Sequence, residues 1–330
     1  MFRNKTILIT GGTGSWGREL TEAVLNEHPK EIRIFSRNEY AQVLMKRDFQ
    51  LDSRLRFIIG DVRDYHAVHD ACQEVDYLFH LAALKHVDVC EDQPDEALKT
   101  NVLGTENMIR ASIKQRVTKV INVSTDKAVD PMNTYGLTKA IGEKLMIHAN
   151  LLSDYTRFVC VRGGNVLGTS GSVVPLFMDQ IRKGKEVTIT HNDMTRFFLT
   201  ISEAIRLLLV AAKESEGGET FVMKMKACRI ADLANVLMEL SGNKPASCKE
   251  IGMRPGERLD EVLISKSEVP YTRQFSEQYY MILPSSSLYG SYERYSQLHQ
   301  VAFSEYHSNA GLMDKAAIAE LLREGGLISE

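Results

Sequence analysis

Two groups of reactive side chains lie close together in the sequence. Thr125, Asp126 and Lys127 end an apolar run, and Tyr135 and Lys139 follow shortly afterwards. The Tyr-x-x-x-Lys spacing places both side chains on one face of a helix. An ammonium beside a phenol favours the phenolate and lowers the pKa of the phenol. Such a tyrosine can take a proton from a substrate hydroxyl while a nicotinamide accepts a hydride, and the lysine can hold the nicotinamide ribose.

The nucleotide site that this chemistry needs is predicted by a glycine-rich segment near the start of the chain. It contains both G-x-G-x-x-G and G-x-x-G-x-x-G, formed by Gly11, Gly12, Gly14 and Gly17. The segment follows an expected strand and opens an expected helix, which is the context that gives this motif its meaning. The glycines allow a tight turn and a close approach of the backbone to a pyrophosphate, and the helix N-terminus offers free N–H groups to that anion.

The end of the second expected strand bears on the choice of dinucleotide. NAD sites usually carry an acidic residue there for the ribose hydroxyls, whereas this chain has Ser36 and Arg37. A hydroxyl and a guanidinium suit a 2′-phosphate, so we favour NADP. NAD is the alternative if Arg37 stacks on the adenine. Asp61, which follows the third strand, is expected near the adenine.

Strand-like and helix-like segments alternate through the first half of the chain. The expected strands are residues 6–10, 32–36, 55–59, 77–82, 120–124 and 158–162. The expected helices are residues 17–27, 64–72, 95–114 and 135–152. This alternation predicts βαβ units, a parallel sheet and an α/β fold of the doubly wound Rossmann type. The strands are almost continuously apolar, as expected when helices cover both faces of a sheet.

After about residue 170 the rhythm changes, which predicts a smaller mixed α/β substrate-binding cap. We expect a dinucleotide-binding core over residues 1–168, to which later segments return, and a cap mainly over 169–284. The remaining tail, 285–330, is rich in serine and tyrosine and ends in an expected helix at 314–323. It is a candidate for contacts in a homo-oligomer.

Composition excludes several functional classes. The 330 residues carry 40 Lys and Arg against 43 Asp and Glu, a net charge of -3, whereas a nucleic-acid-binding protein usually has a basic excess. No apolar run reaches 18 residues, so no membrane span is expected. The five cysteines form no C-x-x-C pair and no signal-like segment begins the chain, which favours the cytoplasm. His66 and His69 have no third ligand nearby in the sequence, so no metal site is expected.

Several short segments, taken together, show a family resemblance. The chain resembles the extended short-chain dehydrogenase/reductases, and among them the UDP-N-acetylglucosamine 4,6-dehydratases of bacterial polysaccharide and glycan biosynthesis. The segments that carry the resemblance are TGGTGS (10–15), GDVRD (60–64), AALKHV (82–87), KTNVLGT (99–105), STDKA (124–128), GNVLG (164–168), GSVVPLF (171–177), MTRF (194–197) and GMRPGE (252–257). Their combination and order are far more specific than any one of them.

The resemblance implies an internal redox cycle on the sugar. Tyr135 would take the proton of the C4 hydroxyl, which Thr125 holds, as hydride passes to the cofactor. The resulting 4-ketone acidifies the C5 proton, which Lys127 would remove while Asp126 protonates the leaving C6 hydroxyl. Hydride then returns to C6, so the cofactor stays tightly bound and is regenerated in each cycle. A neutral lysine and a protonated carboxyl need an unusual environment, which the adjacent pair could create by sharing a proton.

Binding residues also follow from the resemblance. Those expected at the cofactor are Gly11, Gly14, Ser15, Trp16, Gly17, Ser36, Arg37, Asp61, Val62, Ala82, Ala83, Lys85, Asn101, Tyr135 and Lys139. Those expected at UDP-N-acetylglucosamine are Lys85, Asn165, Val173, Thr190, Arg196, Arg254 and Glu257. Arg196 and Arg254 would grip the diphosphate, because arginine binds phosphate oxygens bidentately.

Departures from the family pattern leave alternatives open. Gly163 stands where the family usually has an aromatic residue. The family divides by whether C5 is retained or inverted. The segments around Thr190, Phe197 and Arg254 are similar to the retaining enzymes, whereas Tyr135, the short chain and Ser36-Arg37 are similar to the inverting ones; we favour retention. A nucleotide-sugar 4-epimerase or 4-reductase is a further alternative, although neither has a need for the Asp126–Lys127 pair.

Overall fold

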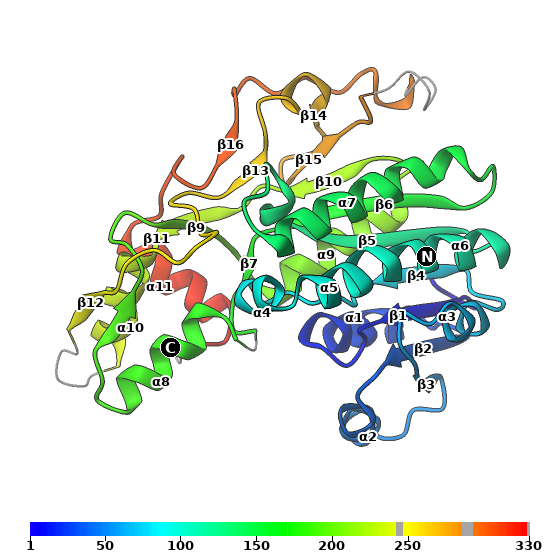
Figure 1. Ribbon diagram of the computed structural model, residues 1–330, viewed down its shortest axis with the longest axis horizontal. Helices are drawn as coiled ribbons and strands as arrows, with labels where there is room; N and C mark the ends of the chain where they lie inside the picture. Colours follow the sequence, from blue (N-terminus) through cyan, green and yellow to red (C-terminus); the bar gives the residue numbers. More distant parts are fainter. Residues whose placement is uncertain (170, 242–246, 286–292, 329–330) are drawn as a thin grey trace.

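A large sheet forms the centre of the molecule (Figure 1). The computed structural model describes residues 1–169, 171–241, 247–285 and 293–328. The nine strands of the sheet follow the order β14 (Thr272–Gln274), β15 (Tyr279–Ile282), β10 (Thr220–Met223), β6 (Arg157–Gly163), β5 (Lys119–Thr125), β4 (Tyr77–His80), β1 (Thr6–Thr10), β2 (Glu31–Ser36) and β3 (Leu55–Ile59). From β3 to β10 the strands are parallel, and β15 and β14 continue the sheet antiparallel. The order with β1 between β2 and β4 is that of a Rossmann-type sheet, so the predicted fold class is confirmed.

Helices cover both faces of this sheet. One face is covered by α1 (Ser15–Leu25) and α9 (Ile201–Glu214), and the other by α3 (Tyr65–Ala71), α6 (Gly104–Lys114) and α7 (Thr134–His148). Because successive strand residues point to opposite faces, Ile7 and Ile9 enter the core beneath α1, whereas Leu8 enters the core beneath α3 and α6. Burial on both faces explains the apolar strands, and it leaves the carboxyl ends of the strands as the place for a ligand.

A smaller layer lies beside the sheet, at the left of Figure 1. Its strands and helices are β7 (Asn165–Val166), β8 (Val187–Ile189), β9 (Thr195–Leu199), β11 (Lys226–Arg229), β12 (Cys248–Glu250), α8 (Val173–Arg182), α10 (Ile230–Leu240) and α11 (Lys315–Glu324). The helices share a third core with β8, β9 and β11, so the end of the tail packs within the chain. α9 and β10 return to the large sheet from the range expected for the cap. The domain boundaries stay a prediction.

The long helix expected at 95–114 is interrupted by a π-helical turn. α5 (Pro94–Leu98) and α6 are joined by that turn, Lys99–Leu103, while α4 (Val87–Asp92) precedes them. Such turns are often found at functional sites. Here the turn carries Asn101, whose amide bonds the backbone N–H (2.8 Å) and C=O (2.9 Å) of Leu84. Its amide also donates to Thr138 Oγ1 (3.0 Å), so Asn101 braces the loop after β4 against α7.

One buried arginine ties three elements together. Arg162, on β6, donates to both carboxylate oxygens of Glu143 on α7 (2.8 and 2.6 Å). It also donates to both oxygens of Glu268 (3.0 and 2.7 Å) and to the carbonyl of Leu263 (3.1 Å), which lies in β13 (Val262–Ile264). The side chains of Arg162 and Glu143 are only 5% and 3% exposed. Buried carboxylates in such a network depend on their cation.

We expect Arg162→Met to destabilise the protein by about 3–5 kcal/mol near neutral pH, because it leaves two buried carboxylates without a cation. Burial raises the pKa of Glu268, but the charge and hydrogen bonds of Arg162 outweigh that effect and hold the pKa below its usual value. A depressed pKa contributes stability above the unfolded-state pKa, about 4.3, and this contribution is lost as the pH falls through the folded-state pKa. The loss of unfolding free energy that Arg162→Met causes, measured with urea, should therefore be smaller below about pH 4 than near neutral pH.

The matched control for this experiment is Arg157→Met, on the same strand. Arg157 is partly exposed and donates to the Ser153 carbonyl (3.3 Å), so its loss should change the free energy of unfolding much less. An equal loss for Arg162→Met at neutral and at acidic pH would contradict the electrostatic explanation and assign the effect to packing.

Candidate active site

A cavity of about 640 Å³ opens at the carboxyl ends of the parallel strands. The loops that follow β1 to β6 contribute most of its lining, through residues 13–17, 35–38, 60–62, 81–86, 123–127 and 163–166. The sequence-predicted residues that line it are Gly11, Gly14, Ser15, Trp16, Gly17, Ser36, Arg37, Asp61, Val62, Ala82, Ala83, Lys85, Thr125, Asp126, Lys127, Tyr135, Lys139 and Asn165. An open α/β sheet binds its ligands at this edge. The fold thus brings both groups of reactive side chains to the glycine loop.

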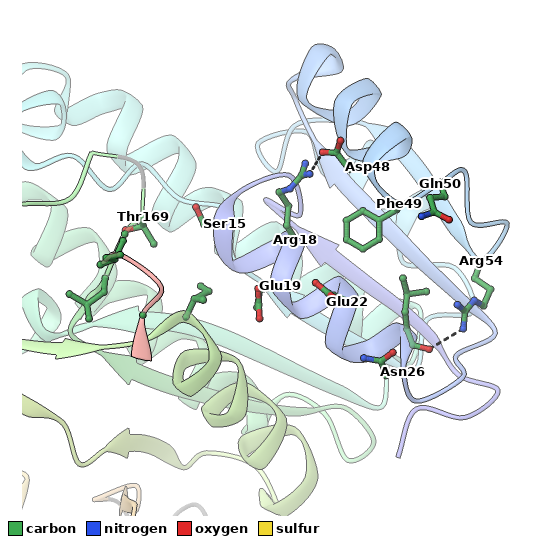
Figure 2. Close-up of a pocket in the computed structure, with 16 residues that line it drawn as sticks. Ser15, Arg18, Glu19, Glu22, Asn26, Asp48, Phe49, Gln50, Arg54 and Thr169 are labelled. Atoms are coloured by element: carbon green, nitrogen blue, oxygen red, sulfur yellow. Dashed lines mark hydrogen bonds and ion pairs between the residues drawn. The ribbon is translucent and has the colours of Figure 1, made fainter. Parts of the chain in front are cut away.

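A second cavity, of about 730 Å³, lies on the outer side of α1 (Figure 2). Arg18 forms an ion pair with Asp48 there, and Arg54 donates to the backbone carbonyl of Leu25 (3.0 Å). These cations are engaged by groups of the protein, and the reactive residues 125–127 do not line this cavity. The cavity at the strand ends is therefore the candidate active site.

The glycine loop is shaped for close contact with a ligand. Gly11 has φ +66°, and a Cβ on it would lie 2.9 Å from the backbone nitrogen of Ala82. A Cβ on Gly17 would lie 2.3 Å from the carbonyl oxygen of Gly12. Gly14 caps α1 without a side chain, which leaves the N–H groups of the first helical turn to an anion. The residues present therefore fit the pyrophosphate of a dinucleotide.

Trp16 lies next to Gly163, the position where the chain lacks the aromatic residue that the family usually has. A Cβ on Gly163 would lie 3.7 Å from the Trp16 ring and 3.9 Å from Leu199. A single carbon fits at these distances, but an aromatic ring extending further would compete with the indole for space. The Trp16 ring thus lies beside position 163, where the family usually has an aromatic residue.

Charges of both signs surround the expected adenosine end of the cavity. Arg37 is half exposed, with Nη1 3.8 Å from Asp61 Oδ2, and Ser36 Oγ accepts a hydrogen bond from Gln42 (3.0 Å). Burial raises the pKa of Asp61, but Arg63 and Arg37 outweigh that effect and lower it overall. Asp61 therefore stays ionised beside Arg37, and the preference for NADP remains a prediction.

Thr125, Asp126 and Lys127 form a connected cluster where β5 ends. Thr125 Oγ1 donates to Asp126 Oδ1 (2.8 Å), and Lys127 Nζ donates to the same oxygen (3.1 Å). The Asp126 side chain is 1% exposed. Its other oxygen, Oδ2, is buried and has no hydrogen-bond partner among the residues described. An oxygen in this position is available to carry a proton.

The pKa shifts of this pair agree only in part with the expected roles. Burial raises the pKa of Asp126, and the charge of Glu261 raises it further, which favours the protonated acid. Burial lowers the pKa of Lys127, but the charges of Asp126 and Glu261 outweigh it and raise the pKa overall. Lys127 is therefore charged in the resting state and becomes a base only after it gives a proton away, and Asp126 Oδ1, at 3.1 Å, is the nearest carboxylate oxygen. The roles of the pair stay predictions.

The tyrosine and lysine of α7 also differ from expectation. Burial raises the pKa of Tyr135 to about 12, and Lys127 and a hydrogen bond with Thr125 offset only part of that rise. The expected lowering of the phenol pKa by Lys139 is thus wrong. Lys139 Nζ donates to the Val123 carbonyl (2.6 Å), and burial lowers its pKa to about 8. Lys127 is the cation that acts on the tyrosine.

The remaining predicted residues lie outside the cavity lining. They are Asn101, Val173, Thr190, Arg196, Arg254 and Glu257. The Glu257 carboxylate accepts a hydrogen bond from the backbone N–H of Arg254 (2.9 Å) in a loop near the cap, and Thr190 Oγ1 contacts Met194 Sδ (3.1 Å). Their roles at a substrate stay predictions.

The Arg196 guanidinium is bonded to groups of the protein itself. Arg196 is buried, and its guanidinium donates to the carbonyls of Thr195 (2.7 Å), Leu259 (3.1 Å) and Arg258 (3.0 Å). Its Nε lies 3.4 Å from Glu261 Oε1. The donors of Arg196 thus hold the backbone before β13, and its expected grip on a diphosphate stays a prediction.

Glu261 is a residue of the site that the sequence did not predict. Its carboxylate is buried and lies 3.2 Å from Lys127 Nζ. The one signal in the sequence is an acidic residue placed directly before the apolar strand β13, but the distance along the chain from Lys127 hides the contact.

The sheet order, the glycine loop after β1 and the Tyr-x-x-x-Lys pair on α7 give the chain the fold of the extended short-chain dehydrogenase/reductases. The chain belongs to the polysaccharide biosynthesis protein family, whose model matches residues 7–283. Among the described residues, no helix is long and apolar enough to cross a membrane, and no three His, Cys, Asp or Glu side chains are grouped to hold a metal.

Relatives of this chain carry different names. A protein of Methanocaldococcus jannaschii, described as an uncharacterized membrane protein, is 47% identical over 292 residues, which cover 86% of this chain and 87% of that protein. A Rickettsia prowazekii protein named UDP-glucose 4-epimerase is 48% identical over 276 residues, 82% of this chain and 80% of that protein.

Two solved structures resemble the fold. The X-ray structure of Pen from Bacillus thuringiensis has a TM-score of 0.91 and 36% identity, and the match covers 98% of this chain and 99% of that one. The dTDP-glucose 4,6-dehydratase of Streptomyces venezuelae, crystallised with NAD and TYD, has a TM-score of 0.71 at 22% identity, over 77% of this chain and 86% of that one. The second likeness shows the fold alone.

The environment of Arg37 gives a test of cofactor choice. We expect Arg37→Ala to weaken NADP binding by about tenfold or more and NAD binding much less, because a guanidinium pairs with a 2′-phosphate that NAD lacks. Isothermal titration of both dinucleotides measures this. Arg47→Ala, at an exposed position on α2 (Glu39–Asp48), is the control. Equal weakening of both dinucleotides would instead indicate stacking of Arg37 on the adenine.

Proposed function

We propose that the protein is a UDP-N-acetylglucosamine 4,6-dehydratase, a hydro-lyase of nucleotide-sugar metabolism in bacterial surface-glycan biosynthesis. The observation that carries the proposal is the ion pair of the buried Asp126 with the partly buried Lys127, beside Tyr135. Loss of water across C5 and C6 of a sugar needs one group that takes the C5 proton and another that gives a proton to the leaving hydroxyl. These two functions require two adjacent side chains with different proton affinities.

Each residue has a defined task in this proposal. Tyr135 takes the proton of the C4 hydroxyl, and Thr125 hydrogen-bonds the C4 oxygen. Lys127 then takes the C5 proton, and Asp126 gives a proton to the departing C6 hydroxyl. A bound nicotinamide dinucleotide, NADP or NAD, supplies reversible hydride transfer. Lys139 keeps its ammonium on the Val123 carbonyl, within reach of the ribose side of the cavity.

One proton transfer within the pair prepares it for the reaction. Lys127 and Asp126 share a hydrogen bond of 3.1 Å, along which a proton moves from the ammonium to the carboxylate. That transfer creates the neutral base and the neutral acid in one step, with no change in net charge. Burial favours it, because both charged forms lose their hydration in the cavity.

The second candidate is a nucleotide-sugar 4-epimerase. The name of the Rickettsia prowazekii relative supports it, and so do Tyr135 and Lys139, which serve oxidation at C4 in either reaction. Epimerisation at C4 leaves C5 and C6 untouched, so it gives no role to a buried acid and base next to the tyrosine. For this reason we favour dehydration. The cytoplasm and a homo-oligomeric assembly are parts of the same proposal.

Purified protein incubated with UDP-N-acetylglucosamine should give a product lighter by one water, with no net consumption of added cofactor. Mass spectrometry of the sugar nucleotide measures this. A product of unchanged mass would favour the epimerase, and stoichiometric consumption of NADPH would favour the 4-reductase. Either result would overturn the proposal.

Variants of the pair should separate its two tasks. We expect Lys127→Met and Asp126→Asn each to slow water loss by about 10²–10⁴-fold, the usual contribution of an acid or a base. In deuterated water at alkaline pH, Asp126→Asn should still exchange the C5 proton of recovered substrate, because Lys127 can lose its proton to water there and Asp126 no longer raises its pKa, whereas Lys127→Met should not. Lys183→Met, which removes an exposed lysine paired with Asp179, is the control. Loss of exchange in Asp126→Asn alone would reverse the assignment.

The configuration at C5 is open to a direct measurement. We propose retention, on the similarity of the segments around Thr190, Phe197 and Arg254 to the retaining enzymes. Proton NMR of the product should then show ring coupling constants of the D-configured sugar. Coupling constants of the C5 epimer would identify the inverting reaction and would leave the dehydration itself unaffected.

A further inference from the structure

Glu261 completes a chain of four charges at the candidate active site, of which Asp126, Arg196 and Glu261 are buried and Lys127 is partly buried. Its Oε1 lies 3.2 Å from Lys127 Nζ and 3.4 Å from Arg196 Nε, and Lys127 in turn lies 3.1 Å from Asp126. Glu261 itself is 3% exposed. Two carboxylates therefore compete for one lysine, and only one of them has a second cation.

The fold fixes Glu261 from a distant part of the chain. Its backbone N–H donates to Ser308 Oγ (2.9 Å), and its carbonyl accepts from the Ser308 N–H (2.8 Å). Ser308 follows β16 (Tyr306–His307), which pairs with β13, and its hydroxyl also contacts Thr195 Oγ1 (2.6 Å). The tail beyond residue 285 thus holds a carboxylate against a lysine that lies about 130 positions earlier along the chain.

The two carboxylates are not equivalent. Arg196 supports Glu261 and is fixed by three backbone carbonyls, so this ion pair persists when Lys127 loses its proton. Asp126 has only Lys127 as a cation, and one of its oxygens has no partner in the described part of the chain. In a buried cluster with too few cations, the carboxyl with the weaker support takes up the proton.

We propose that Glu261 is a positioning residue that supplies the permanent negative charge of the cluster, so that the available proton resides on Asp126 or Lys127 and never on Glu261. The proposal rests on the dehydratase function for its consequence in catalysis, but not for its electrostatics. Glu261 raises the proton affinity of both members of the pair. It thereby sets the pH range over which the pair holds one proton that can move between Asp126 and Lys127.

The other charged groups near Glu261 do not replace it. Arg258 contributes a positive charge, but its guanidinium donates to the carbonyls of Val129 and Asp130. Tyr135 faces the pair from α7 and is neutral, because burial raises its pKa to about 12. Among the charged groups described around Lys127, Asp126 and Glu261 are the anions that raise its pKa, and Arg196 opposes them.

The first experiment needs no substrate. The purified full-length protein is labelled with ¹³C at the aspartate side-chain carboxyl carbon, and the Asp126 signal is assigned by its loss in Asp126→Asn. We expect Glu261→Gln to lower the titration midpoint of Asp126 by about one pH unit or more, because a neighbouring anion is removed. Glu261→Asp keeps the charge but moves it back by one methylene. The Asp126 midpoint in this variant should therefore lie between those in the natural protein and in Glu261→Gln.

The second experiment measures activity. The pH profile of UDP-N-acetylglucosamine dehydration depends on two proton losses of the pair, and Glu261→Gln should move both limbs toward lower pH by about one unit. Glu261→Asp should stay closer to the natural profile. A lower rate with unmoved limbs in both variants would mean a merely structural role and would overturn the inference.

The two experiments separate this inference from the proposed function. If the natural protein removes no water from the sugar, the proposed function fails, and the Asp126 titration still decides the role of Glu261. If water is lost but the Asp126 midpoint is the same in all three proteins, the inference is overturned and the function stands. If Glu261→Gln does not fold, the inference is tested by the smaller shift of the Asp126 titration midpoint in Glu261→Asp.

Discussion

The interaction on which the site depends is the bonding of Arg162 to Glu143 and Glu268. Its guanidinium reaches from β6 to the helix that carries Tyr135 and Lys139, and to the segment just after β13. The three elements that meet there are the ones that deliver the tyrosine, the wall of the cavity and Glu261. A buried arginine with planar, bidentate partners fixes angles as well as distances. The positions of these elements are thus fixed by a charge that does not line the cavity.

The sequence predicts the half of the site that is local along the chain. The glycine loop, the residues that end β5 and the Tyr-x-x-x-Lys pair each lie within one strand–loop–helix unit, so spacing alone places them at the carboxyl edge of the sheet. The sheet order then brings them together, because β1, β4 and β5 are neighbours. Arg37 and Asp61 follow the same rule through β2 and β3.

The other half depends on contacts that spacing does not reveal. Glu261 meets Lys127 only because β13 pairs with β16 and the Ser308 hydroxyl fixes the backbone before β13. Arg196 was expected at a diphosphate because arginine suits phosphate, yet its neighbours in space are carbonyl groups and a carboxylate. The proton affinities of the site could not be predicted from the sequence for the same reason. Burial raises the pKa of Tyr135 more than any adjacent ammonium lowers it, and burial is a property of the whole fold.

The difference between the half of the site that is local along the chain and the half that is distant has a consequence for how such a site changes during evolution. The Asp126–Lys127 pair lies in one short loop, so a single local change could create or remove it. Its proton affinities, however, depend on burial and on Glu261 and Arg196, which both lie within residues 169–284, and Ser308 of the tail holds the backbone of Glu261. A chain that acquired the pair alone would hold Lys127 against one carboxylate, and the resulting ion pair would keep both groups charged. A second buried anion is what allows the carboxyl to take a proton while the lysine remains beside it. The proton affinities of the pair therefore depend jointly on the strand-end loop and on Glu261, which Ser308 of the distant tail holds in place.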